Sequence, residues 1–127
     1  HGLIGILAHG HGGHHGGGIF INTLDHARFG LLFLRNGKWN DKQLVSENWV
    51  NVVQQPSAAF KRYGYLWWLN TDKEWPNLSS KIYYAAGYGG NYIVIYKVHD
   101  LVVVTRWMGD DKIDEVLELI IKSIENK

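Results

Sequence analysis

The 127-residue sequence has no cysteine, only two prolines and almost no excess of charge of either sign. The lack of cysteine excludes a disulfide framework, a thiolate metal site and a cysteine nucleophile. Thirteen Lys and Arg against twelve Asp and Glu give a net charge of +1, which provides no basic surface of the kind that binds nucleic acid. No apolar run approaches the ~18 residues needed to span a bilayer, and residues 1–8 are too short for a signal peptide. We therefore expect a soluble chain without nucleic-acid or membrane partners.

Glycine and histidine are concentrated at one end of the chain. Residues 1–18 contain eight of the fifteen glycines and five of the seven histidines, and we interpret them as a Gly/His-rich loop. His9, His11, His14 and His15 lie close together there, and imidazole is a common metal ligand. No acidic or cysteine ligand lies nearby, so we favour the alternative of a polar loop with only incidental metal affinity. The sequence implies no cofactor.

Residues 22–36 are predicted to form a helix that Asn22 or Thr23 can cap. Its expected apolar stripe consists of Leu24, Ala27, Phe29, Leu31, Leu32 and Leu34. Gly30 lies inside this helix. Because a mid-helix glycine costs roughly 1 kcal/mol relative to alanine, we expect another backbone to pack closely against it. Gly37 stands where a left-handed helix end is expected.

Two further helices are predicted. Ser46 can cap a short helix that ends before Pro56, and its apolar face would carry Trp49, Val50 and Val53. The last helix is expected to be capped by Asp110 or Asp111. Its unbroken apolar stripe consists of Ile113, Val116, Leu117, Ile120, Ile121 and Ile124.

Four runs rich in β-branched and aromatic residues predict strands, at 63–70, 82–87, 91–98 and 101–108. The tight connection at residues 98–100 predicts that the last two strands form an antiparallel hairpin. Residues 101–104 are apolar at every position, which predicts a strand covered on both faces. The loop at 70–81 contains Trp75 and Pro76 and is expected to be rigid and partly buried. The fold class is therefore α+β, with a small antiparallel sheet and flanking helices.

The sequence offers no recognisable nucleophile. None of its five serines lies in Gly-x-Ser-x-Gly, and none is followed three residues later by lysine. The acidic residues near position 110 have the spacing of a helix start, which accounts for them without a catalytic role.

Three glycines, Gly87, Gly89 and Gly90, interrupt an aromatic strand. A glycine within a strand marks a bulge or a close approach of another group to the backbone. One interpretation is a strand edge whose free N–H groups point at a ligand oxygen, as in an oxyanion hole. The other is a tight bend. A phosphate loop is excluded, because neither glycine pair is followed by lysine and no helix begins there.

Several motifs occur together in a characteristic order. They are residues 14–30 (HHGGGIFINTLDHARFG), 37–40 (GKWN), 63–68 (YGYLWW), 85–92 (AAGYGGNY) and 100–104 (DLVVV). In this order and at this spacing they resemble the C-terminal part of the class C β-lactamase-like serine hydrolases. That family includes β-lactamases, D-Ala-D-Ala carboxypeptidases, esterases and 6-aminohexanoate hydrolases. The resemblance covers nearly the whole chain and implies the C-terminal part of a β-lactamase/transpeptidase-like fold.

The resemblance implies an acyl-transfer enzyme that acts on a small ester or amide. In the family, a serine activated by lysine and tyrosine forms an acyl-enzyme that water hydrolyses. The carried-over role of Tyr88 is to donate its backbone N–H to the oxyanion. Gly87, Gly89 and Gly90 would permit the substrate to approach, and Tyr92 would line the pocket.

This sequence departs from the family pattern in two ways. Ala85 and Ala86 replace a polar pair, which favours substrates that lack the carboxylate of β-lactams. The Ser-x-x-Lys pair and the catalytic tyrosine motif are absent, so we expect residues 1–127 to be inactive alone. They would form either a single domain or the C-terminal fragment of a larger one. Loss of the family's N-terminal strands would leave an open sheet edge, and self-association or a partner would cover it. A non-enzymatic interaction domain and a His-rich metal-binding module remain the alternatives.

Overall fold

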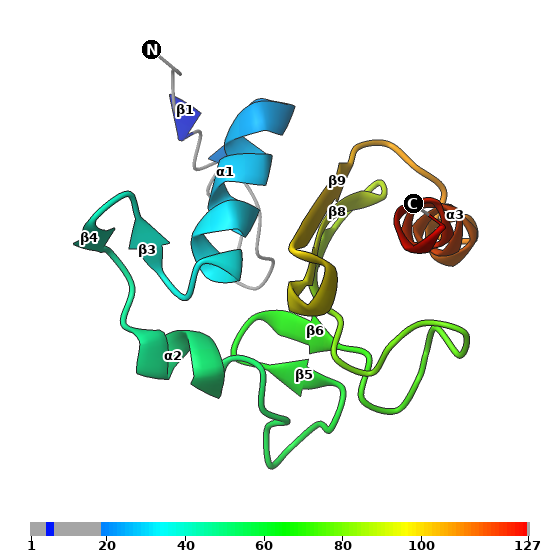
Figure 1. Ribbon diagram of the computed structural model, residues 1–127, viewed down its shortest axis with the longest axis horizontal. Helices are drawn as coiled ribbons and strands as arrows, with labels where there is room; N and C mark the ends of the chain where they lie inside the picture. The colour runs from blue at the N-terminus through cyan, green and yellow to red at the C-terminus, as the bar shows by residue number, and fades with distance from the viewer. Residues whose placement is uncertain (1–4, 7–18, 127) are drawn as a thin grey trace.

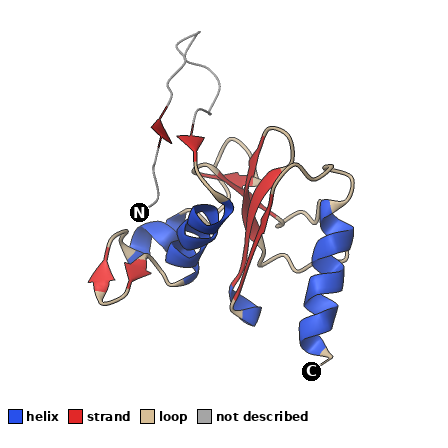
Figure 2. Ribbon diagram, turned by 90° about the horizontal axis from the view of Figure 1, so that it is seen from above, coloured by secondary structure: helices blue, strands red, loops and turns tan. Residues whose placement is uncertain are grey.

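A five-stranded antiparallel sheet separates two apolar layers in the computed structural model, which describes residues 5–6 and 19–126 (Figure 1). The strands follow one another in the order β5-β6-β7-β8-β9, so each pairs with its neighbour in the sequence. Helix α1 (Thr23–Leu34) covers one face of the sheet, and helix α3 (Ile113–Glu125) covers the other (Figure 2). The predicted α+β class is confirmed.

The sheet consists of β5 (Tyr63–Gly64), β6 (Trp67–Leu69), β7 (Tyr83–Gly87), β8 (Asn91–Tyr96) and β9 (Leu101–Thr105). Two small antiparallel pairs lie outside it, β1 (Gly5–Ile6) with β2 (Ile19–Phe20) and β3 (Lys38–Trp39) with β4 (Lys42–Gln43). A short helix, α2 (Glu47–Val52), and a 3-10 turn (Lys97–His99) complete the elements. Within this part of the chain, no helix is long and apolar enough to cross a bilayer.

Helix α1 starts at the predicted cap, because the Asn22 side chain accepts a hydrogen bond from the Asp25 N–H at 2.9 Å. Its buried face, however, is formed by Gly30, Phe33 and Leu34. Leu24, the first residue of the predicted stripe, is 68% exposed. The predicted stripe is therefore wrong in part. The close packing predicted at Gly30 is confirmed, but its partners are side chains of the sheet rather than a backbone.

Helix α3 follows the predicted periodicity, whereas α2 follows it only in part, because Trp49 of its predicted apolar face is 43% exposed. Ser46 caps α2 through the Trp49 N–H, and the apolar side of α2 buries Val50 and Val53. Helix α3 buries its predicted stripe at Ile113, Leu117 and Ile121. Its predicted caps are wrong, because Lys112 occupies the cap position and makes no side-chain capping bond. Asp110 instead accepts a hydrogen bond from the Tyr92 hydroxyl at 3.0 Å.

The segment predicted as one strand at 63–70 forms two. Tyr65 and Leu66 have positive φ values of 47° and 74°, which is the conformation of a two-residue hairpin turn. Gly64 and Trp67 pair across this turn. The sequence did not predict this turn, because Tyr65 and Leu66 belong to a hydrophobic run and neither is a usual turn residue.

The last two strands form the predicted antiparallel hairpin, with Tyr96 opposite Leu101. Strand β9 is shorter than expected, since it ends at Thr105 and Trp107 has a φ of 57°. Alternate side chains of β9 face the two helical layers: Val103 packs toward α3 and Val102 toward α1. Residues 101–104 are nevertheless only half-buried, so the predicted cover on both faces is partial.

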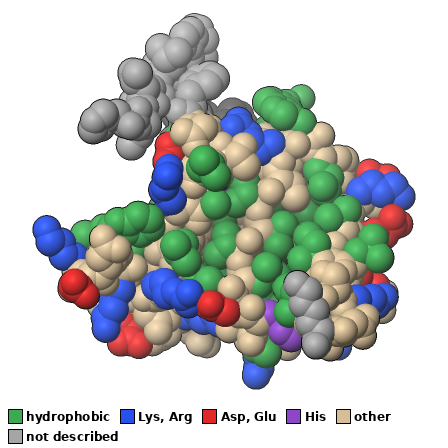
Figure 3. All heavy atoms as spheres, turned by 45° about the horizontal axis from the view of Figure 1, so that its top comes forward, with side chains coloured by type: hydrophobic (Ala, Val, Ile, Leu, Met, Phe, Trp, Pro, Cys, Tyr) green, Lys and Arg blue, Asp and Glu red, His purple; other side chains and the backbone are tan. Residues whose placement is uncertain are grey.

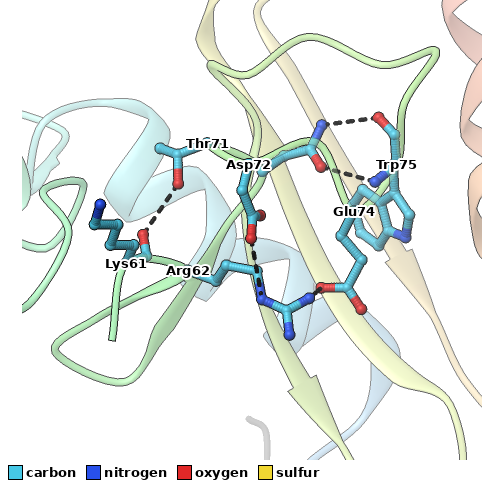
Figure 4. A network of polar contacts seen from close by, with 7 residues as sticks. Lys61, Arg62, Thr71, Asp72, Glu74 and Trp75 are labelled. Carbon is cyan, nitrogen blue, oxygen red and sulfur yellow. Dashed lines mark hydrogen bonds and ion pairs between the residues drawn. The ribbon is translucent and has the colours of Figure 1, made fainter. Parts of the chain in front are cut away.

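The long loop after β6 is organised by the fully buried side chain of Asn70. Figure 4 shows the start of this loop, with Thr71, Asp72 and Trp75 labelled. Its amide oxygen accepts from the Trp75 N–H at 2.9 Å, and its NH2 group donates to the Trp75 carbonyl at 3.1 Å and to those of Leu78 and Ser79. Trp75 is buried as predicted and stacks on Tyr84 with ring centroids 4.2 Å apart. The loop is thereby held against the sheet.

Asn70→Ala is expected to lower the free energy of unfolding by about 2–4 kcal/mol, because it leaves buried backbone groups without partners. Urea unfolding followed by tryptophan fluorescence measures the loss. Asn77→Ala is the matched control: Asn77 is exposed and donates one hydrogen bond to Glu118, so it should cost less than about 1 kcal/mol. Equal losses in the two variants would contradict this role of Asn70.

Candidate functional site

The glycine-rich segment forms the turn between β7 and β8, and we call residues 85–92 the hairpin end. Gly87 pairs with Asn91, and Tyr88, Gly89 and Gly90 connect them. Gly89 and Gly90 have φ values of 76° and 71°, a conformation that residues with a Cβ rarely adopt. A Cβ on Gly90 would lie 1.6 Å from the Met108 carbonyl oxygen. These two glycines therefore account for the tight bend.

Gly87 is under no such constraint. A Cβ there would have its nearest neighbour at 3.7 Å, the Asn91 carbonyl oxygen. The backbone at Gly87 is therefore open to an approaching group, whereas Gly89 and Gly90 are needed for the turn itself.

One edge of β7 is free at the hairpin end. Strand β6 pairs with β7 only at Tyr83 and Tyr84. In the described part of the chain, Ala85, Ala86 and Gly87 thus have a strand on the β8 side alone. Ala86 and Gly87 are exposed. This edge leads directly to the backbone of Tyr88.

Tyr88 projects from the hairpin end with its side chain 99% exposed. Among the described residues, no acceptor takes a hydrogen bond from its backbone N–H. Its carbonyl oxygen accepts a hydrogen bond from the Asn91 side-chain amide at 2.6 Å. This bond fixes the peptide group that joins Tyr88 to Gly89. The Tyr88 N–H is thus a backbone donor that belongs to an exposed residue and has no partner among the described residues.

The hairpin end is anchored to the segment that follows β9. The Gly90 carbonyl accepts from the Thr105 hydroxyl at 3.3 Å and from the Met108 N–H at 3.4 Å. The side-chain oxygen of Asn91 is buried and has no partner in the described residues. The two hydrogen bonds to the Gly90 carbonyl hold the turn in one orientation, as a site built from backbone donors requires.

Tyr92 lies behind the free edge rather than on it. It pairs with Ala86 across β7 and β8, and its ring is 9% exposed within the core shared with α3. Burial, with help from the hydrogen bond to Asp110, raises the pKa of the Tyr92 phenol to about 12. The hydroxyl is therefore protonated at neutral pH and donates to the Asp110 carboxylate.

Sequence reasoning missed Trp107. This side chain is 73% exposed, and its ring lies so close to Gly89 that a Cβ there would be 2.8 Å from a ring carbon. Tyr88 and Trp107 are thus two exposed aromatic residues at the hairpin end. The only signal in the sequence was an aromatic residue near the end of the segment predicted as a strand at 101–108, which is also the pattern of an ordinary strand.

The four candidate metal ligands, His9, His11, His14 and His15, lie outside the described residues. Within residues 5–6 and 19–126, no group of three or more His, Asp or Glu side chains could hold a metal ion.

No family model and no curated protein matches the sequence. Among solved structures, the chain is similar to one named "Putative 6-aminohexanoate-dimer hydrolase from Bacillus anthracis", with a TM-score of 0.61 and 21% sequence identity. The similarity is one of fold. It covers 84% of this chain and 29% of the other, so the chain spans less than a third of that protein's length. The α+β fold is thus shared with part of the protein that carries this name.

Proposed function

We propose that the chain is the C-terminal region of a β-lactamase-related serine hydrolase that transfers the acyl group of an ester or amide. The observation that carries the proposal is the free edge of β7, which leads to the backbone N–H of the exposed residue Tyr88, without a partner among the described residues. The likeness in fold to a protein named as a hydrolase supports it.

In this role the Tyr88 N–H is one donor of the oxyanion hole. A backbone donor fixed by its surroundings stabilises the negative charge that develops on the substrate oxygen in the transition state. Gly87 leaves room for the substrate at that edge, while Gly89 and Gly90 shape the turn. Tyr92 supports the site from behind, opposite Ala86.

The same edge favours substrates without a carboxylate next to the reacting bond. Ala85 and Ala86 present no charge and no hydrogen-bonding side chain at the place where the family carries a polar pair. A carboxylate there would lose its hydration without gaining a partner. Simple esters and amides would incur no such loss.

The nucleophile has to come from elsewhere. Ser46 caps α2, and Ser57, Ser79 and Ser123 make hydrogen bonds to nearby backbone groups. Among the described residues, no serine hydroxyl is hydrogen-bonded to a lysine side chain of the kind that could act as its base.

The isolated chain is expected to give no burst with p-nitrophenyl acetate or nitrocefin, and no adduct with a serine-directed phosphonate, because it lacks an activated serine. Stopped-flow absorbance and intact mass spectrometry measure these outcomes. A stoichiometric burst together with a covalent adduct would contradict the proposal that the nucleophile lies outside these residues.

In the complete enzyme that this proposal requires, Tyr88→Pro is expected to lower kcat by about 10²–10³, because proline has no N–H to donate. Tyr88→Ala keeps the N–H and should lose far less. Steady-state kinetics on p-nitrophenyl esters compare the two variants. Equal rate losses would show that the Tyr88 side chain matters and that its N–H does not.

We also propose that a second copy or a partner segment covers the outer edge of β9, which has a strand on one side only in the described part of the chain. A groove of about 310 Å³ runs beside this edge and is lined by Leu24, Leu31 and Val102, among others. Figure 3 shows hydrophobic side chains gathered across the middle of one face of the molecule. An exposed apolar strand edge favours strand addition, which is also what a non-enzymatic interaction domain would use.

Val104→Lys, at a half-buried residue of β9, is expected to weaken self-association, because a charge on an edge strand opposes pairing with a second strand. Sedimentation velocity over a range of concentrations measures the monomer fraction. Val98→Lys, at a residue that is 57% exposed in the adjoining turn, is the control and should leave association unchanged. A wild-type chain that stays monomeric at all concentrations would contradict self-association.

A further inference from the structure

A second pocket lies at the end of the sheet opposite the hairpin end, where β7 begins and β8 ends. Its volume is about 310 Å³. Four separate segments line it: residues 54–55 after α2, 69 and 71 at the end of β6, 80–83 at the start of β7, and 97–98 after β8. The proposed hydrolase function uses none of them.

The rim of this pocket is polar and carries positive charge only. Lys81 and Lys97 both line it, together with the neutral polar residues Gln54, Thr71 and Ser80. No Asp or Glu is among the described residues that form its wall. Two lysines in the wall of one concave site, with no carboxylate in that wall, favour an anionic ligand.

Lys97 is held in place at this rim. It is half-buried, and its Nζ donates to the Asn36 side-chain oxygen at 2.7 Å. The Asn36 amide in turn donates to Glu47 at 3.4 Å. No carboxylate of the described residues lies within ion-pair distance of Lys97. Burial lowers the pKa of Lys97, and the Glu47 carboxylate raises it in part. An anion beside the ammonium group would further offset the cost of burying its charge.

The floor of the pocket is apolar and rigid. Leu69, Ile82 and Tyr83 line it and are each no more than 2% exposed. The residue next to Leu69 is Asn70, whose buried hydrogen bonds fix the loop that leads to Ser80 and Lys81. Cations at the rim and an apolar floor together match a ligand with a charged head and an apolar body.

We propose that this pocket binds a small organic carboxylate, with its head group at Lys97 and Lys81 and its aliphatic part on Leu69, Ile82 and Tyr83. The site is separate from the hairpin end, and it does not depend on the proposed hydrolase function. Its ligand would be a metabolite-sized monocarboxylate rather than a macromolecule, because a volume of about 310 Å³ between four chain segments matches a small molecule.

The test is an NMR titration of the full chain with pentanoate, acetate and 1-pentanol at constant ionic strength. Pentanoate is expected to shift the amide signals of Ser80, Lys81 and Lys97 in a saturable way. Acetate lacks the apolar body and 1-pentanol lacks the charge, so each should bind at least about tenfold more weakly. Inorganic phosphate is the fourth compound titrated. Binding of phosphate as tight as that of pentanoate would overturn the carboxylate assignment.

Lys97→Met is expected to raise the Kd for pentanoate at least about tenfold, because it removes the fixed cation and keeps a side chain of similar length. Lys81→Met gives a second measurement if Lys97→Met unfolds. Lys42→Met removes the same charge from β4, outside the pocket, and should leave the Kd unchanged. Unchanged binding in both pocket variants, equal binding of pentanol and pentanoate, or shifts confined to the hairpin end would each overturn the proposal.

Discussion

The architecture depends on how closely helix α1 approaches the sheet at Gly30. A Cβ at this position would lie 2.6 Å from a Val102 methyl carbon and 2.9 Å from one of Ile93, which is closer than non-bonded atoms pack. The missing side chain lets the helix settle on β8 and β9, so that Phe33 and Leu34 reach the core around Ile95. With α3 on the opposite face, the central strands are enclosed on both sides and hold the β7–β8 turn in a fixed place (Figure 2).

The two ends of the sheet have different chemical character. At the hairpin end, the backbone provides the polar groups, because β7 extends beyond its pairing with β6, and no described strand pairs with Gly87 on that side. At the opposite end, side chains provide them, with Lys81 and Lys97 above an apolar floor. A backbone donor suits an oxygen whose charge develops during a reaction, whereas a fixed cation suits a ligand that arrives already charged.

Much of the secondary structure could be predicted from local signals. Asn22 and Ser46 cap their helices as expected, and the α3 stripe is buried at Ile113 and Leu117. The errors arose where long-range packing overrode a local pattern. The side of α1 that is buried was decided by where the sheet lies. The turn at Tyr65 was hidden because cross-strand pairing around it, rather than turn-forming residues, specifies it.

By itself the sequence determined the α+β class, the positions of the helices and the glycine-rich turn, because caps, periodicity and glycine act on neighbouring residues. The motif order also pointed toward a fold that the chain shares with part of a solved structure. Only the tertiary structure decided that the edge of β7 is free at Gly87, that Trp107 lies beside the turn and that Lys81 and Lys97 share a pocket. Each of these features depends on residues that are far apart in the chain. Local sequence patterns do not predict which strands and loops come into contact.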